Sequence, residues 1–142
     1  MDNPGRFDYT AVSPQGGEAG LLPLLPLALS YEGESLDVSG LLDTGATVNV
    51  LPYRVLLQLG ARWERQAPAI TLTGNLAQFE AQPIVVIASV GEFPPVRLAF
   101  AWTKADGIPL ILGQVNFFIE FDVCFYRSHR AFDVRPKGQA LT

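Results

Sequence analysis

The sequence predicts a mainly β domain, a closed barrel or a sandwich of sheets, with one or two short helices. Several segments alternate apolar and polar residues with a period of two, which is typical of strands with one buried face. Turn signals rich in glycine, proline and asparagine separate these segments at short intervals. Roughly eight or nine short strands, with no internal repeat, favour a single mainly β unit.

The composition is that of a globular protein. The chain has 142 residues, of which 49% are hydrophobic and 17% charged, enough to bury a core in one domain. A formal net charge of −4 and a sequence pI near 4.8 argue against a nucleic-acid partner, which requires a basic face. The same charge gives no reason to expect an anionic membrane surface as partner.

Cysteine and histidine usage argue against disulfide and metal chemistry. Cys124 and His129 are the only residues of their kinds, so neither an intrachain disulfide nor a Cys/His zinc cluster is expected. The apolar run 21–29 contains two prolines and is shorter than the roughly 20 residues of a membrane-spanning helix. We therefore expect a cytoplasmic protein without metal, cofactor or membrane partner.

The first third of the chain predicts an arm followed by a hairpin. Residues 1–20 mix glycine, proline and serine, and we interpret them as a loose arm with one strand at 7–10. Two strands, 24–31 and 35–42, flank a Glu-Gly-Glu turn, and the second strand alternates apolar and polar residues. The hairpin therefore delivers Asp43 at the end of its second strand.

A short helix is predicted at residues 52–59. Pro52 suits a first helical position, three apolar residues share one face, and Gly60 suits the position just after a helix. Downstream, the turn signal Thr-Gly-Asn at 73–75 separates two short arms, 70–72 and 78–80, and predicts a partly exposed hairpin.

The last part of the chain is predicted to be rich in strands. Residues 83–90 are apolar on both faces, which indicates an interior strand, and residues 96–103 alternate as in a half-buried strand. We also expect the aromatic residues between 117 and 126 to lie in the core. Further strands are predicted at 108–112, 121–126 and 131–134, with one helical turn at 114–118.

A carboxylate interrupts the apolar pattern after the first hairpin. Residues 41–45 read Leu-Leu-Asp-Thr-Gly, and the following residues are again apolar. Since a buried carboxylate is costly unless it is hydrogen-bonded or partly neutralised, we interpret Asp43 as a catalytic acid. A second apolar-apolar-glycine signature, Ile-Leu-Gly, follows at 111–113.

The order of these two signatures, with a flap hairpin predicted between them, resembles the retropepsin-like aspartic proteases, the half-sized relatives of pepsin. The resemblance runs over residues 24–134, and the segment 110–118 followed by 121–123 resembles the C-terminal part of bacterial members. It implies a closed acid-protease barrel, with the protease domain at 21–136 and a tail at 137–142.

The resemblance implies a role for each residue of the first signature. Asp43 would be the catalytic aspartate, and the Thr44 hydroxyl would lock the loop across a two-fold axis. Gly45 would allow close approach of the backbone to the partner loop and to substrate. Ala46 would be the small residue that follows and contacts substrate.

The resemblance also assigns residues around the aspartate. A flap at 72–77 would close over a bound peptide, and a floor of apolar residues would pack under the aspartate loop. The flap residues expected to contact substrate are Leu72, Thr73, Gly74, Asn75 and Leu76. The supporting residues are Leu42, Ile111, Leu112 and Gly113.

This chemistry requires two carboxylates that share one proton. The ionised acid activates a water molecule, and the protonated acid polarises the scissile carbonyl. The chain has one Asp-Thr-Gly, and Asp106, Asp122 and Asp133 lack this pattern. We therefore expect a C2 homodimer that cleaves a peptide or an unfolded protein, with an acidic to mildly acidic pH optimum.

Three alternatives remain open. Asp43 could cap its own turn in a purely structural role, or act as an aspartyl-phosphate nucleophile, although no parallel α/β pattern accompanies it. The third alternative is a catalytically silent module of the same fold that binds peptides or partners. Gln114 favours this module, because the retroviral members carry at this place an arginine that helps to tie the dimer.

Overall fold

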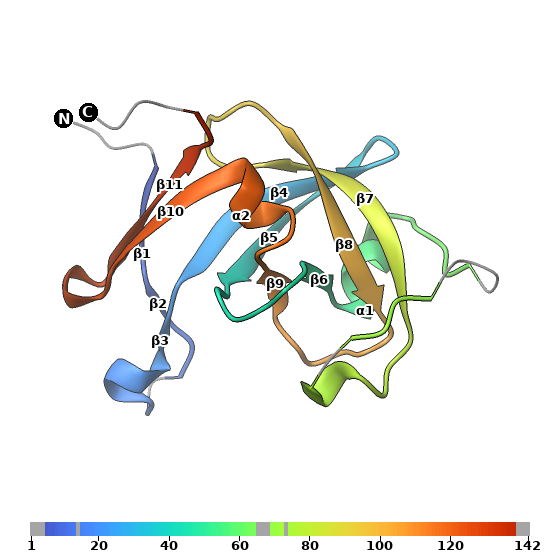
Figure 1. The fold of residues 1–142 in the computed structure, drawn as a ribbon, viewed down its shortest axis with the longest axis horizontal. Helices are drawn as coiled ribbons and strands as arrows, with labels where there is room; N and C mark the ends of the chain where they lie inside the picture. Colours follow the sequence, from blue (N-terminus) through green and yellow to red (C-terminus); the bar gives the residue numbers. More distant parts are fainter. Residues whose placement is uncertain (1–4, 14, 65–68, 73, 139–142) are drawn as a thin grey trace.

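A computed structural model describes residues 5–13, 15–64, 69–72 and 74–138 of the chain. Six strands form a closed barrel in the order β4-β5-β9-β6-β8-β7, and a three-stranded sheet, β1-β11-β10, lies beside it (Figure 1). A two-stranded ribbon, β2-β3, joins the two parts. The prediction of a mainly β, closed barrel with one or two short helices is confirmed, and the structure has two.

The elements are short, as the spacing of turn signals predicts. The strands are β1 (Arg6–Asp8), β2 (Thr10–Ala11), β3 (Leu21–Leu22), β4 (Leu24–Tyr31), β5 (Glu34–Leu42), β6 (Val50–Leu51), β7 (Ala81–Ser89), β8 (Val96–Thr103), β9 (Leu110–Leu112), β10 (Phe121–Tyr126) and β11 (Ala131–Pro136). The helices are α1 (Tyr53–Gln58) and α2 (Phe117–Glu120), with single 3₁₀ turns η1 (Gly17–Gly20), η2 (Gly74–Leu76) and η3 (Arg127–His129).

The β4-β5 hairpin forms where the sequence predicts it. The two strands pair from Leu24 opposite Leu41 to Tyr31 opposite Glu34, which leaves a two-residue turn. Both turn residues, Glu32 and Gly33, have positive φ, of 48° and 87°. A turn with two left-handed residues matches the twist of the flanking strands, so the hairpin continues directly into the barrel wall.

The position of β9 organises the barrel around Asp43. β9 lies between β5 and β6, parallel to β5 and antiparallel to β6, although β5 and β6 are consecutive in the chain. The chain therefore leaves the barrel at the end of β5, forms a loop over residues 43–49, and returns as β6. The ends of β5 and β9 lie side by side under this loop (Figure 1).

The larger of two apolar core clusters fills the barrel and extends under the three-stranded sheet. Its largest fully buried side chains include Trp102, Phe117, Phe121 and Phe132. The helix α1 buries Leu56, and Leu59, which follows its last residue, is also buried. Gly60, with φ of 83°, donates to Leu57 O, and the next residue donates to Leu56 O, so the helix ends in a Schellman motif as Gly60 predicts.

The predicted flap hairpin is wrong for the described residues. Residues 70–72 and 78–80 form no strand, and η2 occupies positions 74–76; Thr73 lies outside the described residues. Leu72 is buried against Val50, Ala81 and Ala101, and Ile70 donates its N–H to Ala81 O. The segment therefore packs onto the barrel wall, because burial of Leu72 outweighs pairing between two polar arms.

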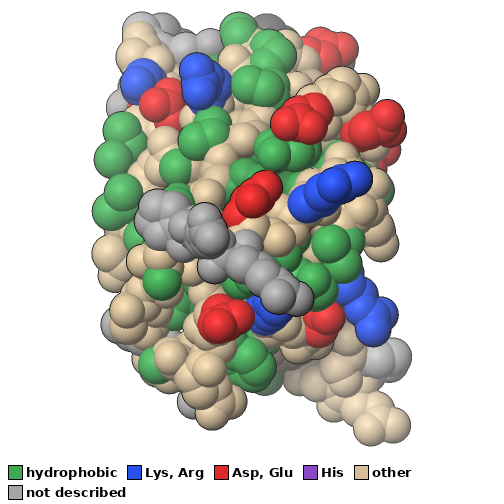
Figure 2. All heavy atoms as spheres, turned by 90° about the vertical axis from the view of Figure 1, so that its right-hand side faces the viewer, with side chains coloured by type: hydrophobic (Ala, Val, Ile, Leu, Met, Phe, Trp, Pro, Cys, Tyr) green, Lys and Arg blue, Asp and Glu red, His purple; other side chains and the backbone are tan. Residues whose placement is uncertain are grey.

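Three smaller expectations also need correction. β7 pairs with both β4 and β8, as an interior strand should, but Val85 and Ile87 on its outer face are exposed. On the side of the molecule that carries β7 and α1, hydrophobic side chains lie among acidic and basic ones (Figure 2). Phe125 and Tyr126 are exposed and not in the core as expected, since β10 is an edge strand in its sheet. The helical turn predicted at 114–118 begins only at Phe117.

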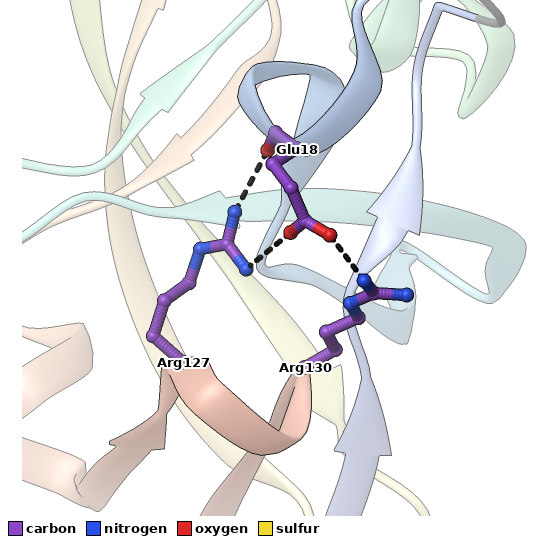
Figure 3. A network of polar contacts seen from close by, with 3 residues as sticks. All are labelled: Glu18, Arg127 and Arg130. Carbon is purple, nitrogen blue, oxygen red and sulfur yellow. Dashed lines mark hydrogen bonds and ion pairs between the residues drawn. The ribbon is translucent and has the colours of Figure 1, made fainter.

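The N-terminal segment is integrated into the fold, and not a loose arm, over its described residues. β1 pairs with β11, and Tyr9 donates its N–H to Arg130 O. The Glu18 carboxylate in η1 pairs with the guanidinium groups of Arg127 and Arg130 at the β10-β11 turn (Figure 3). In the described part of the chain, no helix has the length and apolar character needed to cross a bilayer.

Candidate active site

Asp43 begins the loop that follows β5, and its carboxylate is held by its own turn. The Asp43 N–H donates to Leu112 O at 3.0 Å, which continues the β5-β9 pairing by one residue. Asp43 Oδ1 accepts the Gly45 N–H at 2.9 Å, and Asp43 O accepts the Ala46 N–H at 3.1 Å. The half-buried carboxylate is therefore fixed in direction by the backbone of the Asp-Thr-Gly turn itself.

The end of β9 forms the floor of this loop, as the second sequence signature predicts. A Cβ atom on Gly113 would lie 2.6 Å from Val48 O and 2.9 Å from Ala46 O. Both atoms belong to the backbone of the loop, so only glycine allows the two segments to lie this close. Beneath them, Leu42 and Leu112 are buried in the core, and Ile111 is half-buried.

Asn49 connects the loop to the barrel, and sequence reasoning missed it. Its side chain, 1% exposed, accepts the Gly113 N–H at Oδ1 over 2.7 Å and donates from Nδ2 to Ala99 O over 3.0 Å. Its backbone O accepts the Ala101 N–H. The signal was present in the sequence as an amide between two apolar residues, because a buried amide needs hydrogen-bond partners.

Gln114 holds the Asp43 loop at two points and was also missed as a site residue. Its N–H donates to Ala46 O at 2.9 Å, and its side-chain Nε2 donates to Thr44 O at 2.8 Å. Val115 continues the contact by donating its N–H to Thr47 O. The loop is therefore fastened along the segment that follows β9.

A cavity of about 300 Å³ opens beside the loop and brings together five of the predicted site residues. Gly45 and Ala46 line it from the aspartate loop, Leu72 and Leu76 from the segment around η2, and Ile111 from β9. The remaining lining residues are Thr47, Val48, Val50, Ile70 and Thr71. The predicted flap segment thus lies across the cavity from the aspartate loop, although it is not a hairpin.

The lining of this cavity does not include six other predicted residues that the structure describes: Leu42, Asp43, Thr44, Gly74, Leu112 and Gly113. Thr44 is exposed in the turn next to Asp43, and Gly74, with φ of 65°, begins η2. Nothing further is described for Thr73 or for the side chain of Asn75. Among the described side chains no ion pair involves Asp43, and no three His, Cys, Asp or Glu residues are grouped as metal ligands.

A larger cavity, of about 530 Å³, lies elsewhere on the barrel. It is lined by the β4-β5 turn, the segment after α1, and β7, and it shares no lining residue with the first cavity. None of the predicted site residues contributes to it. The residues that the sequence points to therefore gather at the smaller cavity.

No protein-family model and no curated protein matches this sequence. Among solved structures, a retropepsin-like aspartic protease from Rickettsia conorii is similar with a TM-score of 0.59 and 14% identity, over 92% of this chain and 90% of that chain. The retroviral protease-like domain of Ddi1 from Leishmania major gives a TM-score of 0.54 and 13% identity, over 84% and 99% of the two chains. The EIAV protease in complex with the inhibitor HBY-793 gives a TM-score of 0.47 and 20% identity, over 65% of this chain and 81% of that chain.

The likeness to the Rickettsia and Leishmania structures spans most of this chain. In this chain, the two signature segments form the arrangement in which β9 inserts between β5 and β6 under the Asp43 loop. The chain has the retropepsin-like fold.

Proposed function

We propose that the chain is an aspartic endopeptidase that acts as a homodimer, with one Asp43 from each subunit. The observation that carries the proposal is the placement of Asp43 at the end of β5. Its carboxylate is oriented by the Gly45 N–H, and Gly45 and Ala46 of the same turn line a mainly apolar cavity together with residues of the segment around η2. A purely structural turn would not require such a cavity beside it.

The second subunit supplies what the single chain lacks. General acid–base hydrolysis of a peptide by aspartates needs one ionised and one protonated carboxyl at the same bond. Thr44 and Gly45 are exposed at the tip of the turn, so a second copy can approach Asp43 from this side. An isologous two-fold contact would bring the two turns together.

The two carboxyl groups divide the reaction between them. The ionised carboxylate takes a proton from water, whose oxygen attacks the scissile carbonyl carbon. The protonated carboxyl donates to the carbonyl oxygen, and a proton then passes to the amine as the C–N bond breaks. Water is the nucleophile, so no covalent enzyme intermediate forms.

The cavity supports an extended, partly apolar substrate. Its walls include Val48, Val50, Ile70, Leu72 and Ile111, which would accept an aliphatic or aromatic side chain. A peptide in extended conformation places alternate side chains on one side and offers its backbone for hydrogen bonds. We therefore assign unfolded protein or flexible peptide as the substrate class.

Cleavage of an unstructured protein by purified wild type, Asp43→Asn and Asp37→Asn tests the proposal, with mass in solution measured at each concentration. Asp37 is exposed on the same strand, so its substitution is a matched control. We expect cleavage to rise with the dimer fraction, to be lost in Asp43→Asn and to persist in Asp37→Asn. A dimeric wild type that cleaves nothing between about pH 3 and pH 7.5, a range that spans the ordinary titration of carboxyl groups, would contradict the proposal.

Gln114 favours one alternative function, a catalytically silent module that binds peptides. The side chain of Gln114 is engaged with Thr44 O within its own chain, and it carries no charge with which to tie a second subunit. A wild type that stays monomeric and binds an unfolded protein without cutting it would support this alternative.

A further inference from the structure

We propose that Gln114 is a positioning residue that acts on Asp43 through the peptide bond between Thr44 and Gly45. The C=O of this peptide accepts a hydrogen bond from Gln114 Nε2 at 2.8 Å. The N–H of the same peptide donates to Asp43 Oδ1 at 2.9 Å. One side-chain amide and one carboxylate therefore hold the two ends of a single peptide unit. The inference rests on the proposed protease function, because it assigns a role in that reaction.

Peptide geometry makes this coupling direct. The atoms of a peptide bond are coplanar, so fixing the direction of the Thr44 C=O also fixes the direction of the Gly45 N–H. Hydrogen bonds in series polarise one another, and a bond accepted by the carbonyl strengthens the donor on the other side. Gln114 thus orients and strengthens the donor that faces the Asp43 carboxylate.

The same residue also fixes the far end of the turn. The Gln114 backbone N–H donates to Ala46 O at 2.9 Å, and Asp43 N–H donates to Leu112 O at 3.0 Å. The turn is therefore anchored before, within and after the Thr44–Gly45 peptide. A substitution at position 114 removes the side-chain anchor and leaves the two backbone anchors in place.

The neutral amide suits this position for an electrostatic reason. Gln114 offers a donor to Thr44 O without placing a charge beside two carboxyl groups that share one proton. Glutamate has the same size, but its carboxylate repels the Thr44 carbonyl and donates only when protonated, near its ordinary pKa of about 4.3. The Gln114→Glu variant therefore turns the proposed bond on and off with pH.

The experiment compares the wild type with Gln114→Ala and Gln114→Glu, and uses Gln58→Ala and Gln58→Glu as controls. Gln58 is exposed on α1 and lines neither cavity. Peptide cleavage gives kcat and KM against pH, and NMR gives the exchange rate of the Gly45 amide. Urea unfolding shows that each variant is folded.

We expect Gln114→Ala to lower kcat about tenfold, the size of one lost hydrogen bond, with KM within about twofold of wild type. The acid limb of its pH–activity profile should move to higher pH, because the hydrogen bond from the Gly45 N–H to the ionised Asp43 carboxylate is weakened. Gln114→Glu should be impaired at neutral pH and approach wild type below about pH 4.3. Gly45 amide exchange should rise about tenfold in Gln114→Ala.

The failures are distinguishable. If wild type cleaves and Gln114→Ala matches it in kcat, pH profile and Gly45 exchange, the positioning role is wrong and the protease proposal stands. If dimeric wild type cleaves nothing, the protease proposal fails. The ordinary glutamate pKa lies between about pH 4 and about pH 7. A folded Gln114→Glu with the same activity relative to wild type at these two pH values would also overturn the positioning role.

Discussion

Asn49 and Gly113 are joined by a buried hydrogen bond in which the Gly113 N–H donates to Asn49 Oδ1 at 2.7 Å. The bond connects the end of the Asp43 loop to the end of β9. The other end of the Asn49 amide donates to Ala99 O, beside β6. Asn49 directly precedes β6, so its side chain ties this strand to its two neighbours in the barrel, β9 and β8.

Replacing Asn49 by leucine should destabilise the protein strongly. The substitution keeps the size of the side chain but leaves the Gly113 N–H and the Ala99 carbonyl without the partners that Asn49 provides. The unpaired Gly113 N–H is buried and costs about 1–3 kcal/mol, and the part-buried Ala99 carbonyl costs less, so we expect a loss of about 2–4 kcal/mol from the unfolding free energy. Urea unfolding measures this loss, with Ser39→Ala on the exposed face of β5 as control. A loss no larger than that of the control would show that the Asn49 bonds do not support the fold.

Two glycine substitutions should separate folding from catalysis. Alanine at Gly113 would place its Cβ 2.6 Å from Val48 O, and this backbone atom must move. Alanine at Gly45 would meet only Asp43 Oδ1, at 3.3 Å, which a small rotation of the carboxylate relieves. We expect Gly113→Ala to lower the urea midpoint clearly, and Gly45→Ala to keep it while lowering cleavage. Equal effects of the two variants on stability would contradict this assignment.

The regular strands could be predicted because their signal is local. Alternation of apolar and polar residues fixes which face of a strand is buried, and β4, β8 and β10 begin and end where the pattern predicts. The flap hairpin was wrong because a Thr-Gly-Asn turn is compatible with both a hairpin and a 3₁₀ turn. The choice depends on the burial of Leu72 against residues that are distant in sequence.

The residues of the candidate site also fall into two groups, those with a local sequence signal and those whose role depends on residues distant in sequence. Asp43 and Gly113 stand out because a carboxylate or a glycine ends an apolar run, and both are visible in a few residues of sequence. Asn49 and Gln114 are different, since their partners Gly113 and Thr44 lie 64 and 70 positions away. Their roles follow from the insertion of β9 between β5 and β6, which no local pattern encodes.

Tyr31 should make the stability of the protein depend on pH in the alkaline range. Burial raises the pKa of its phenol above the ordinary value of 10.0, and the nearby Glu32 carboxylate raises that pKa further. A raised pKa in the folded state means that the unfolded chain releases this proton more readily. The protonated Tyr31 phenol therefore contributes fully to the free energy of unfolding below about pH 10, and this contribution is lost as the pH rises through the pKa of the folded state.

The measurement for Tyr31 is urea unfolding between about pH 9 and 11, the range around the ordinary tyrosine pKa, for wild type and Tyr31→Phe. We expect the urea midpoint of wild type to fall more steeply with pH than that of the variant. Absorbance titration should show one fewer late-titrating tyrosine in the variant. Identical slopes of midpoint against pH would contradict the burial of the Tyr31 hydroxyl.

The Glu18 carboxylate should control local order of the N-terminal segment and not global stability. It pairs with Arg127 at 3.1 Å and with Arg130, and Arg127 also donates to Glu18 O at 2.7 Å (Figure 3). All three side chains are exposed, so water and salt weaken their attraction, and the core does not depend on it. Glu18→Gln should therefore leave the urea midpoint nearly unchanged but speed amide exchange around η1 and β3. High salt should have the same effect on wild type, and Glu34→Gln, at the exposed start of β5, is the control. Unchanged exchange in Glu18→Gln would show that hydrogen bonds to the backbone, such as those of β1 with β11 and of β2 with β3, hold this segment, because the substitution leaves them untouched.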